Sequence, residues 1–204
     1  MRIKTANYVK IYQLSLLLKI GLYVKSFEIL LLLKKKMKRF KVEIKWAVIF
    51  SIVAILWMWI EKLAGLHDKY IDYQQYLTNL FFFPAVAMMI LALREKKQKY
   101  FEGNITYWQG MKSGLVLSAF IAILSPVNQW ITTYVITPEY FPNVIKRSVE
   151  LGYFATIEEA QNHFNFENYV VMSFIFSFVM GIITTSIVMI FLKSKNKKPD
   201  NVES

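Results

Sequence analysis

Acidic and histidine side chains gather in two polar connections, and their types could bind a divalent metal ion. Imidazole and carboxylate groups are common ligands of zinc and other transition metals, and an i, i+4 spacing puts two such groups on one helix face. Solvated loop residues have the same composition, and we favour that interpretation. The two candidate groups are His67, Asp68 and Asp72 in one connection, and Glu158, Glu159 and His163 in the other.

Motifs that would define an enzyme are absent from the sequence. It contains no cysteine, which excludes thiol catalysis, disulfides and iron-sulfur or zinc-thiolate sites. It also contains no HExxH, phosphate-binding P-loop or GxSxG pattern. We therefore predict no catalytic residue, no cofactor site and no metal site, and we expect a protein that is not an enzyme.

Uncharged polar side chains inside long apolar segments are the other group that could do chemistry. Hydroxyl and amide groups at membrane depth, with prolines that free backbone carbonyls, could line a path for a polar solute. Interhelical hydrogen bonds and kinks explain the same residues, and we favour that explanation. The residues predicted for helix packing or a pathway are Ser118, Ser125, Pro126, Asn128, Gln129, Thr132, Ser173, Ser177, Gly181 and Thr184.

Four apolar segments must position these side chains, and each is long enough to cross a bilayer. A helix rises 1.5 Å per residue, so about 20 apolar residues cover the hydrocarbon core. We expect Glu61 and Lys62, near the end of the first segment, to snorkel to the interface. The predicted fold is all-α, an integral membrane bundle of four transmembrane helices. The predicted spans are residues 44–63, 77–93, 114–136 and 169–192.

Small and polar residues recur at steps of three and four in the third and fourth spans. A helix places such residues in one narrow stripe, and small side chains let two helix backbones approach closely. We expect the two stripes to pack against each other. They comprise Gly114, Ser118, Ala122, Ser125, Gln129 and Thr132 in the third span, and Ser173, Ser177, Gly181 and Thr184 in the fourth.

The connections between the spans differ in length and character. Residues 65–76 and 94–113 are expected to be loops, and Pro84 should kink the second span unless it falls in the first turn. The connection 137–168 is long enough for two short helices. One is expected from about Asn143 to Leu151, after Pro138 and Pro142 end the third span. The second should begin at Thr156, where Glu159 completes a capping box, and run to about Phe164.

Positive charge is concentrated near the N-terminus and beside the spans. The net charge is +11, and residues 1–36 hold 8 Lys or Arg and 1 acidic residue. Basic residues that flank apolar segments are typical of membrane topology signals, so we expect no nucleic-acid partner. Residues 1–36 form a basic extension, interpreted as lying upstream of a true start at Met37 or as an interfacial helix. Residues 37–195 form the membrane domain, and the tail 196–204 is expected to be disordered.

The distribution of Lys and Arg around the spans also predicts their orientation. Twelve such residues flank the spans on one side, and four lie on the other. Because cytoplasmic flanks carry the excess of positive charge, both termini should be cytoplasmic. With four spans, the connection 137–168 then faces outward.

The order of several short motifs between about Met37 and Lys195 resembles a bacterial family of four-span membrane proteins known as domain of unknown function 4199. This resemblance implies a four-helix architecture in the bacterial cytoplasmic membrane and transfers no activity, because the family has none assigned. The motifs are GLHD at 65–68, NLF at 79–81 with Pro84, ALRE at 92–95, WQGMKSG at 108–114, SP at 125–126, ITPEYFPN at 136–143, EEA at 158–160 with Phe164 and Tyr169, and MGI at 180–182.

Three functional hypotheses follow from these features. The leading one is a non-enzymatic membrane scaffold or interaction protein, because catalytic motifs are missing and two spans carry packing stripes. The alternative is a small transporter or channel component that uses the polar face of the third span. A lipid-modifying enzyme that uses Asp68, Asp72 and Glu139 is the least favoured. The expected partners are the lipid bilayer and a second copy of the chain or another membrane protein.

Overall fold

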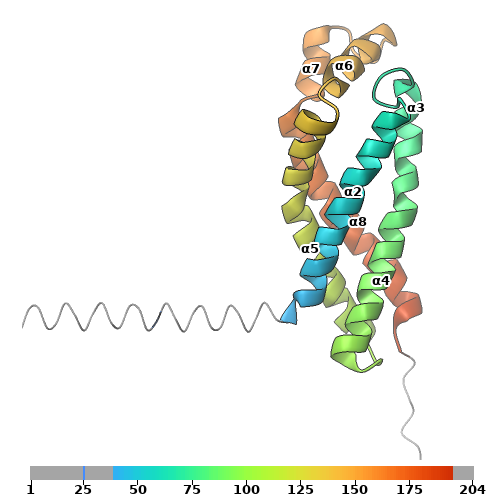
Figure 1. Ribbon diagram of the computed structural model, residues 1–204, viewed down its shortest axis with the longest axis vertical. Coiled ribbons are helices and arrows are strands. Elements are labelled where there is room, and N and C mark those ends of the chain that lie inside the picture. Colours follow the sequence, from blue (N-terminus) through green and yellow to red (C-terminus); the bar gives the residue numbers. More distant parts are fainter. Residues whose placement is uncertain (1–24, 26–38, 195–204) are drawn as a thin grey trace, which may run out of the picture. The chain divides into compact units, whose positions relative to one another are not determined.

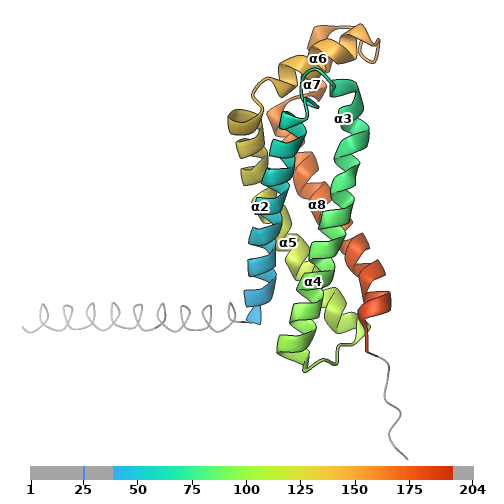
Figure 2. The same cartoon turned by 45° about the vertical axis from the view of Figure 1, so that its right-hand side comes forward.

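The computed structural model describes residue 25 and residues 39–194, and within them the chain is helical with no β-strand. The chain divides into two units, residues 1–41 and 42–204, and the bundle below is formed by the second. The predicted extension 1–36, apart from Lys25, and the tail 196–204 lie outside the described residues. Four helical segments in the described part are long and apolar enough to span a membrane, as predicted. The fold is therefore an all-α bundle of membrane-spanning helices (Figures 1 and 2).

The four spanning segments run beyond the predicted apolar limits. They are α2 (Lys41–Leu63); α3 (Ile71–Leu77), the 3₁₀ turn η1 (Thr78–Phe81) and α4 (Phe82–Phe101) in succession; α5 (Tyr107–Ile131) with the π-helical turn η2 (Thr132–Ile136); and α8 (Phe166–Leu192). Two short helices, α6 (Tyr140–Glu150) and α7 (Ile157–His163), occupy the long connection. They lie at one end of the bundle, called here the α6–α7 end (Figure 1).

The two expected loops are shorter than predicted. The connection predicted over 94–113 narrows to five residues because α4 continues to Phe101 and α5 begins at Tyr107. A full capping box explains this early start, since Thr106 accepts from the Gln109 backbone N–H and Gln109 accepts from that of Thr106. Part of the loop predicted over 65–76 is helical as α3. Hydropathy located the apolar stretch, whereas the capping groups fix where the helices begin.

The prolines lie where helices tolerate them or adjust to them. Pro84 falls in the first turn of α4, directly after the 3₁₀ turn, so its missing N–H breaks no interior hydrogen bond. Pro142, predicted to end a helix, lies in the first turn of α6 for the same reason, so α6 begins earlier than predicted. Pro126 lies inside α5. The Ser125 hydroxyl donates to the Ala122 carbonyl at 2.9 Å, the carbonyl that Pro126 cannot reach with an N–H.

Helices α5 and α8 form the closest pair in the bundle, and glycines set their separation. A Cβ atom at Gly114 would lie 2.1 Å from Thr185 Cγ2, and one at Gly110 would lie 2.2 Å from Met189 Sδ. A Cβ atom at Gly181 would lie 2.1 Å from the hydroxyl of Ser118, which is fully buried. Steps of four along both antiparallel helices therefore bring each small residue opposite a larger one.

The apolar core lies in the half of the bundle away from the α6–α7 end. Its buried members come from α2, α4, α5, α8 and the short connection before α5, and include Ala47, Leu93, Ile105, Leu117 and Met189. Tight packing there holds the four spans together at one end. The half nearer α6 and α7 is less filled, and it contains the candidate site.

Candidate functional site

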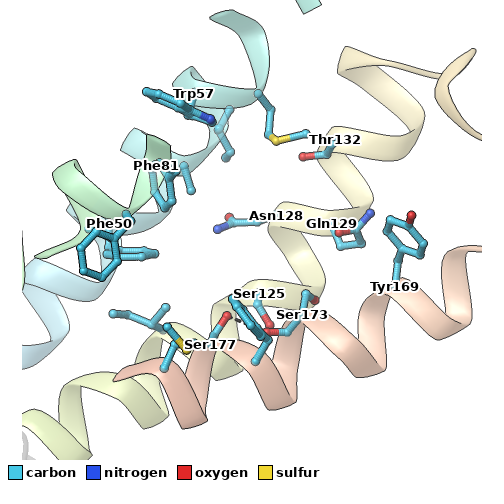
Figure 3. Close-up of a pocket in the computed structure, with 18 of the residues that line it drawn as sticks. Phe50, Trp57, Phe81, Ser125, Asn128, Gln129, Thr132, Tyr169, Ser173 and Ser177 are labelled. Atoms are coloured by element: carbon cyan, nitrogen blue, oxygen red, sulfur yellow. Dashed lines mark hydrogen bonds between the residues drawn. The ribbon is translucent and has the colours of Figure 1, made fainter. Parts of the chain in front are cut away.

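A cavity of about 470 Å³ lies among the spanning helices, and every one of them contributes to its wall. Its volume is within the usual range for small-molecule sites. None of the described residues that line it carries a formal charge. The uncharged polar residues of the wall are Gln74, Asn79, Ser125, Asn128, Gln129, Thr132, Thr133, Thr137, Ser173, Ser177 and Thr184 (Figure 3).

The polar wall on α5 is built around the turn that follows Pro126. Gln129 donates from its amide nitrogen to the Thr133 hydroxyl at 3.1 Å, which fixes the Gln129 side chain against the π-helical turn. Asn128 extends from α5 toward the wall that carries Phe50 and Phe81 (Figure 3). Within residues 39–194 the Asn128 amide group makes no hydrogen bond, although it lines the cavity. The amide thus offers both donors and an acceptor to a guest.

The facing wall on α8 carries hydroxyl groups that are already bonded to their own helix. Ser173 donates to the Val170 carbonyl at 3.0 Å, and Ser177 donates to the Ser173 carbonyl at 2.6 Å. Such bonds let a hydroxyl sit in an apolar environment, and its oxygen can still accept a hydrogen bond from a guest. The α8 wall is therefore weakly polar, whereas the Asn128 amide on α5 makes no hydrogen bond within the described residues.

Aromatic rings form the remaining walls. Phe81, from the 3₁₀ turn, packs between two rings of α2, with centroid distances of 5.6 Å to Phe50 and 5.6 Å to Trp57. At the α6–α7 end, Tyr140 and Phe141 of α6 pack against Tyr169 of α8. Aromatic rings bury large apolar areas at preferred edge-to-face angles, so these walls would contact the apolar part of a guest.

The pathway residues predicted from the sequence mostly meet at this cavity. Eight of the ten line it, and two do not: Ser118 is buried in the contact between α5 and α8, and Pro126 lies on α5 beside the cavity without lining it. Sequence reasoning missed the aromatic wall. Phe50 and Trp57 lie seven residues apart on one face of α2, and that spacing was the available signal.

Glu61 and His67 form a buried pair at the α6–α7 end, which corrects two predictions. Glu61 was expected to snorkel, yet it is 2 % exposed, accepts a hydrogen bond from the Trp57 indole and lies 3.2 Å from His67 Nε2. Its neighbour Lys62 donates to the Ile136 carbonyl at the end of the π-helical turn. His67, expected to be a solvated loop residue, is 3 % exposed because the chain returns toward α2 after Gly65, at φ +75°.

The metal sites considered from the sequence are not assembled in the described residues, where no three acidic or histidine groups come together. Asp72 forms a two-pronged ion pair with Arg147 of α6, at 2.8 and 2.7 Å. The hydrogen bonds that Arg147 donates to Asp72 raise the pKa of Arg147 above its usual value, and Glu150 adds to this effect. Glu159 stabilises the N-terminus of α7, since its backbone N–H donates to the Thr156 hydroxyl and its carboxylate accepts from the Ala155 N–H.

Tyr140 separates the Glu61 and His67 pair from the cavity. Its ring packs edge-on against His67 at 5.3 Å, and its hydroxyl lies 3.5 Å from that of Tyr169. Burial raises the pKa of the Tyr140 phenol well above its usual value, and the neighbouring Tyr169 raises it further. Tyr140 therefore stays neutral, and the cavity keeps an uncharged wall on this side.

A buried ion pair lies at the opposite end of the bundle. Lys96 of α4 lies 2.8 and 3.0 Å from the two carboxylate oxygens of Glu43 of α2, and Ser113 of α5 donates to the same carboxylate at 2.7 Å. The Lys96 ammonium also lies 3.9 Å from the centre of the Tyr100 ring. These contacts tie three spans together at the end away from the cavity.

Taken together, the fold and cavity define a helical integral membrane protein with an uncharged cavity between its spans. Residues 45–194 match the sequence model of the family described as protein of unknown function (DUF4199), and the chain belongs to that family. No curated protein and no solved structure matches the chain.

Proposed function

We propose that this chain is a membrane-embedded binding protein, and that it holds an uncharged amphiphilic small molecule between its spans. The carrying observation is the cavity of about 470 Å³, which has a free amide at Asn128, aromatic walls and no charged lining residue. A charged guest would be buried without a counter-ion, at a cost of several kcal/mol. An uncharged guest with one polar group matches the wall, because Asn128 can bond that group while the rings cover the rest.

Binding within the membrane is compatible with transport, the alternative function predicted from the polar residues of the third span. The polar residues of that span lie on the cavity wall, which supports a site for a guest more than a continuous pore. The scaffold hypothesis has less support, because the stripes of small residues that suggested a partner helix are used within the chain. Gly114, Ser118 and Gly181 lie in the contact between α5 and α8. Most of the other stripe residues line the cavity. We therefore retain binding, with or without movement across the membrane, as the function.

For the orientation, we propose that the α6–α7 end faces outward from the bacterial cytoplasmic membrane and that both termini are cytoplasmic. The excess of Lys and Arg beside the opposite end supports this arrangement. In sealed inside-out vesicles, protease should remove an epitope fused after Ser204, and in intact spheroplasts it should not. Cleavage in spheroplasts alone would reverse the orientation.

Nile red, an uncharged fluorescent amphiphile, provides a test of the binding site. Full-length protein in nanodiscs is expected to give a saturable rise in fluorescence above that of empty nanodiscs. Asn128→Leu removes the free amide and should weaken binding about fivefold, the equivalent of one hydrogen bond of about 1 kcal/mol.

The matched control is Val127→Leu, a neighbouring substitution at a side chain that is 55 % exposed on the outer surface of α5. It should leave the Nile red affinity unchanged. Non-saturable fluorescence equal to that of empty nanodiscs, or equal affinities for the wild type and Asn128→Leu, would remove the support for this site.

A further inference from the structure

The Glu61 and His67 pair is a buried group that the binding site itself does not use. The two side chains are 2 % and 4 % exposed, and each comes from a different side of the left-handed turn at Gly65. His67 Nδ1 is buried and has no hydrogen-bond partner among the described residues. A buried polar atom without a partner is costly, and ionisable groups within membrane-spanning segments are rare and often functional.

The geometry leaves the pair able to take one proton. With Glu61 ionised, His67 Nε2 must carry the hydrogen that lies between them, because two acceptors 3.2 Å apart would repel. The Nδ1 atom then holds a free lone pair, and the pair has a net charge of −1. A proton from the aqueous phase that bonds to Nδ1 makes an imidazolium beside the carboxylate and brings the net charge to zero.

The pair is linked to the cavity through two of its wall residues. Trp57 lines the cavity and donates its indole N–H to Glu61, and Tyr140 lines it and packs on the His67 ring. A change in the charge or hydrogen bonding of the pair therefore acts directly on two rings that a guest would contact.

Other polar groups around the pair already have partners. The Lys62 ammonium is held by the Ile136 carbonyl, Asp68 accepts from the Lys69 backbone N–H, and the Asn143 amide of α6 donates to the His67 carbonyl at 3.0 Å. On the far side of Tyr140 lies the Tyr169 phenol of α8. None of the contacts in this region supplies an acceptor or donor for His67 Nδ1 among the residues described.

We propose that Glu61 and His67 form a proton-binding site, and that its loading is coupled to occupancy of the cavity through Trp57 and Tyr140. The coupling rests on the proposed binding function, whereas the proton site does not. Because coupling between two sites is reciprocal, a guest that changes the proton affinity of the pair must have its own affinity changed by the same factor. The membrane protein thereby responds to the proton concentration on the side where α6 and α7 lie.

The chain itself supplies a reference for testing this proposal. It contains only two histidines, and the second, His163, is exposed at the end of α7. Full-length protein with ¹⁵N-labelled imidazole nitrogens, reconstituted in lipid, allows both rings to be titrated in one sample by NMR. Assignment uses His163→Gln, which leaves His67 as the sole signal.

As the pH is lowered, the His67 Nδ1 signal should change from the unprotonated to the protonated form. Glu61→Gln should lower the midpoint of that change, because the carboxylate that favours the imidazolium is lost. Added Nile red should move the His67 midpoint and leave that of His163 in place. Nile red affinity should differ about fivefold or more between the two protonation states.

A His67 ring that keeps one tautomer throughout the pH range in which His163 titrates would overturn the proton site, and this outcome needs no substitution. A His67 midpoint that is identical with and without bound Nile red would overturn the coupling. If Nile red does not bind at all, the proposed binding function and the coupling fail together, while the His67 titration still decides the proton site.

Discussion

Lys96→Met should lower the free energy of unfolding of the bundle by about 3–5 kcal/mol, because it leaves the Glu43 carboxylate buried without its cation. Glu43 is 2 % exposed, and among the residues the structure describes Ser113 would be its remaining donor. The substitution should weaken the contacts among α2, α4 and α5, since the pair and the serine join these three helices. Unfolding by sodium dodecyl sulfate in mixed micelles, followed by circular dichroism, measures the change.

Two further variants distinguish the effect of the buried pair on stability from the effect of an exposed charge. Lys99→Met removes an ammonium that is 64 % exposed on the same helix and pairs with Glu95, so it should leave the unfolding curve close to that of the wild type. Lys96→Met combined with Glu43→Met removes both charges and should recover most of the loss, because no buried charge remains. Equal unfolding curves for Lys96→Met and the wild type would show that the pair does not hold the bundle together.

Gly114→Leu should prevent α5 and α8 from reaching their observed separation and should cost about 3 kcal/mol or more. Overpacking a tight contact usually costs about 1–3 kcal/mol, and here even the first added carbon would lie 2.1 Å from Thr185. Thr185 is fully buried, and its hydroxyl donates to the Gly181 carbonyl at 2.7 Å, so it has little room to move. The same mixed-micelle unfolding experiment gives the measurement.

The neighbouring position provides the matched control for Gly114→Leu. Leu115 is 42 % exposed on the outer surface of the bundle, so Leu115→Phe should change the stability by no more than about 0.5 kcal/mol. Gly110→Ala should cost less than Gly114→Ala, because the atoms it meets belong to the flexible Met189 side chain. If Gly114→Leu and Leu115→Phe were equally stable, the α5 and α8 contact would not depend on glycine.

The features predicted well from the sequence are those that depend on local hydropathy and on the spacing of residues along one helix. Uncharged runs located the four spans, and small residues at steps of three and four marked the faces of α5 and α8 that meet. Both signals are local and periodic, so one sequence suffices to read them. The polar residues that line the cavity were selected from the same pattern, as residues for helix packing or for a pathway, and the sequence did not distinguish these two alternatives.

The features that were missed depend on contacts between distant segments. Glu61 looked like a charge at the end of a span, and only the turn at Gly65, which returns His67 to it, makes it a buried group. The aromatic wall joins α2 to a 3₁₀ turn of the next span, a pairing that hydropathy does not encode. The i, i+4 spacing of Trp57 and Glu61 was the one local sign that this end of α2 is organised.

The central claim, that the cavity holds an uncharged amphiphile, is tested most directly by the sites at which a photoreactive long-chain alcohol attaches to the protein in native membranes. Mass spectrometry of the irradiated protein should find the label on cavity residues such as Phe50, Ser125 and Ser177, and Asn128→Leu should reduce it there. Labelling confined to outward-facing side chains such as Ile123, which is 62 % exposed, would contradict the claim.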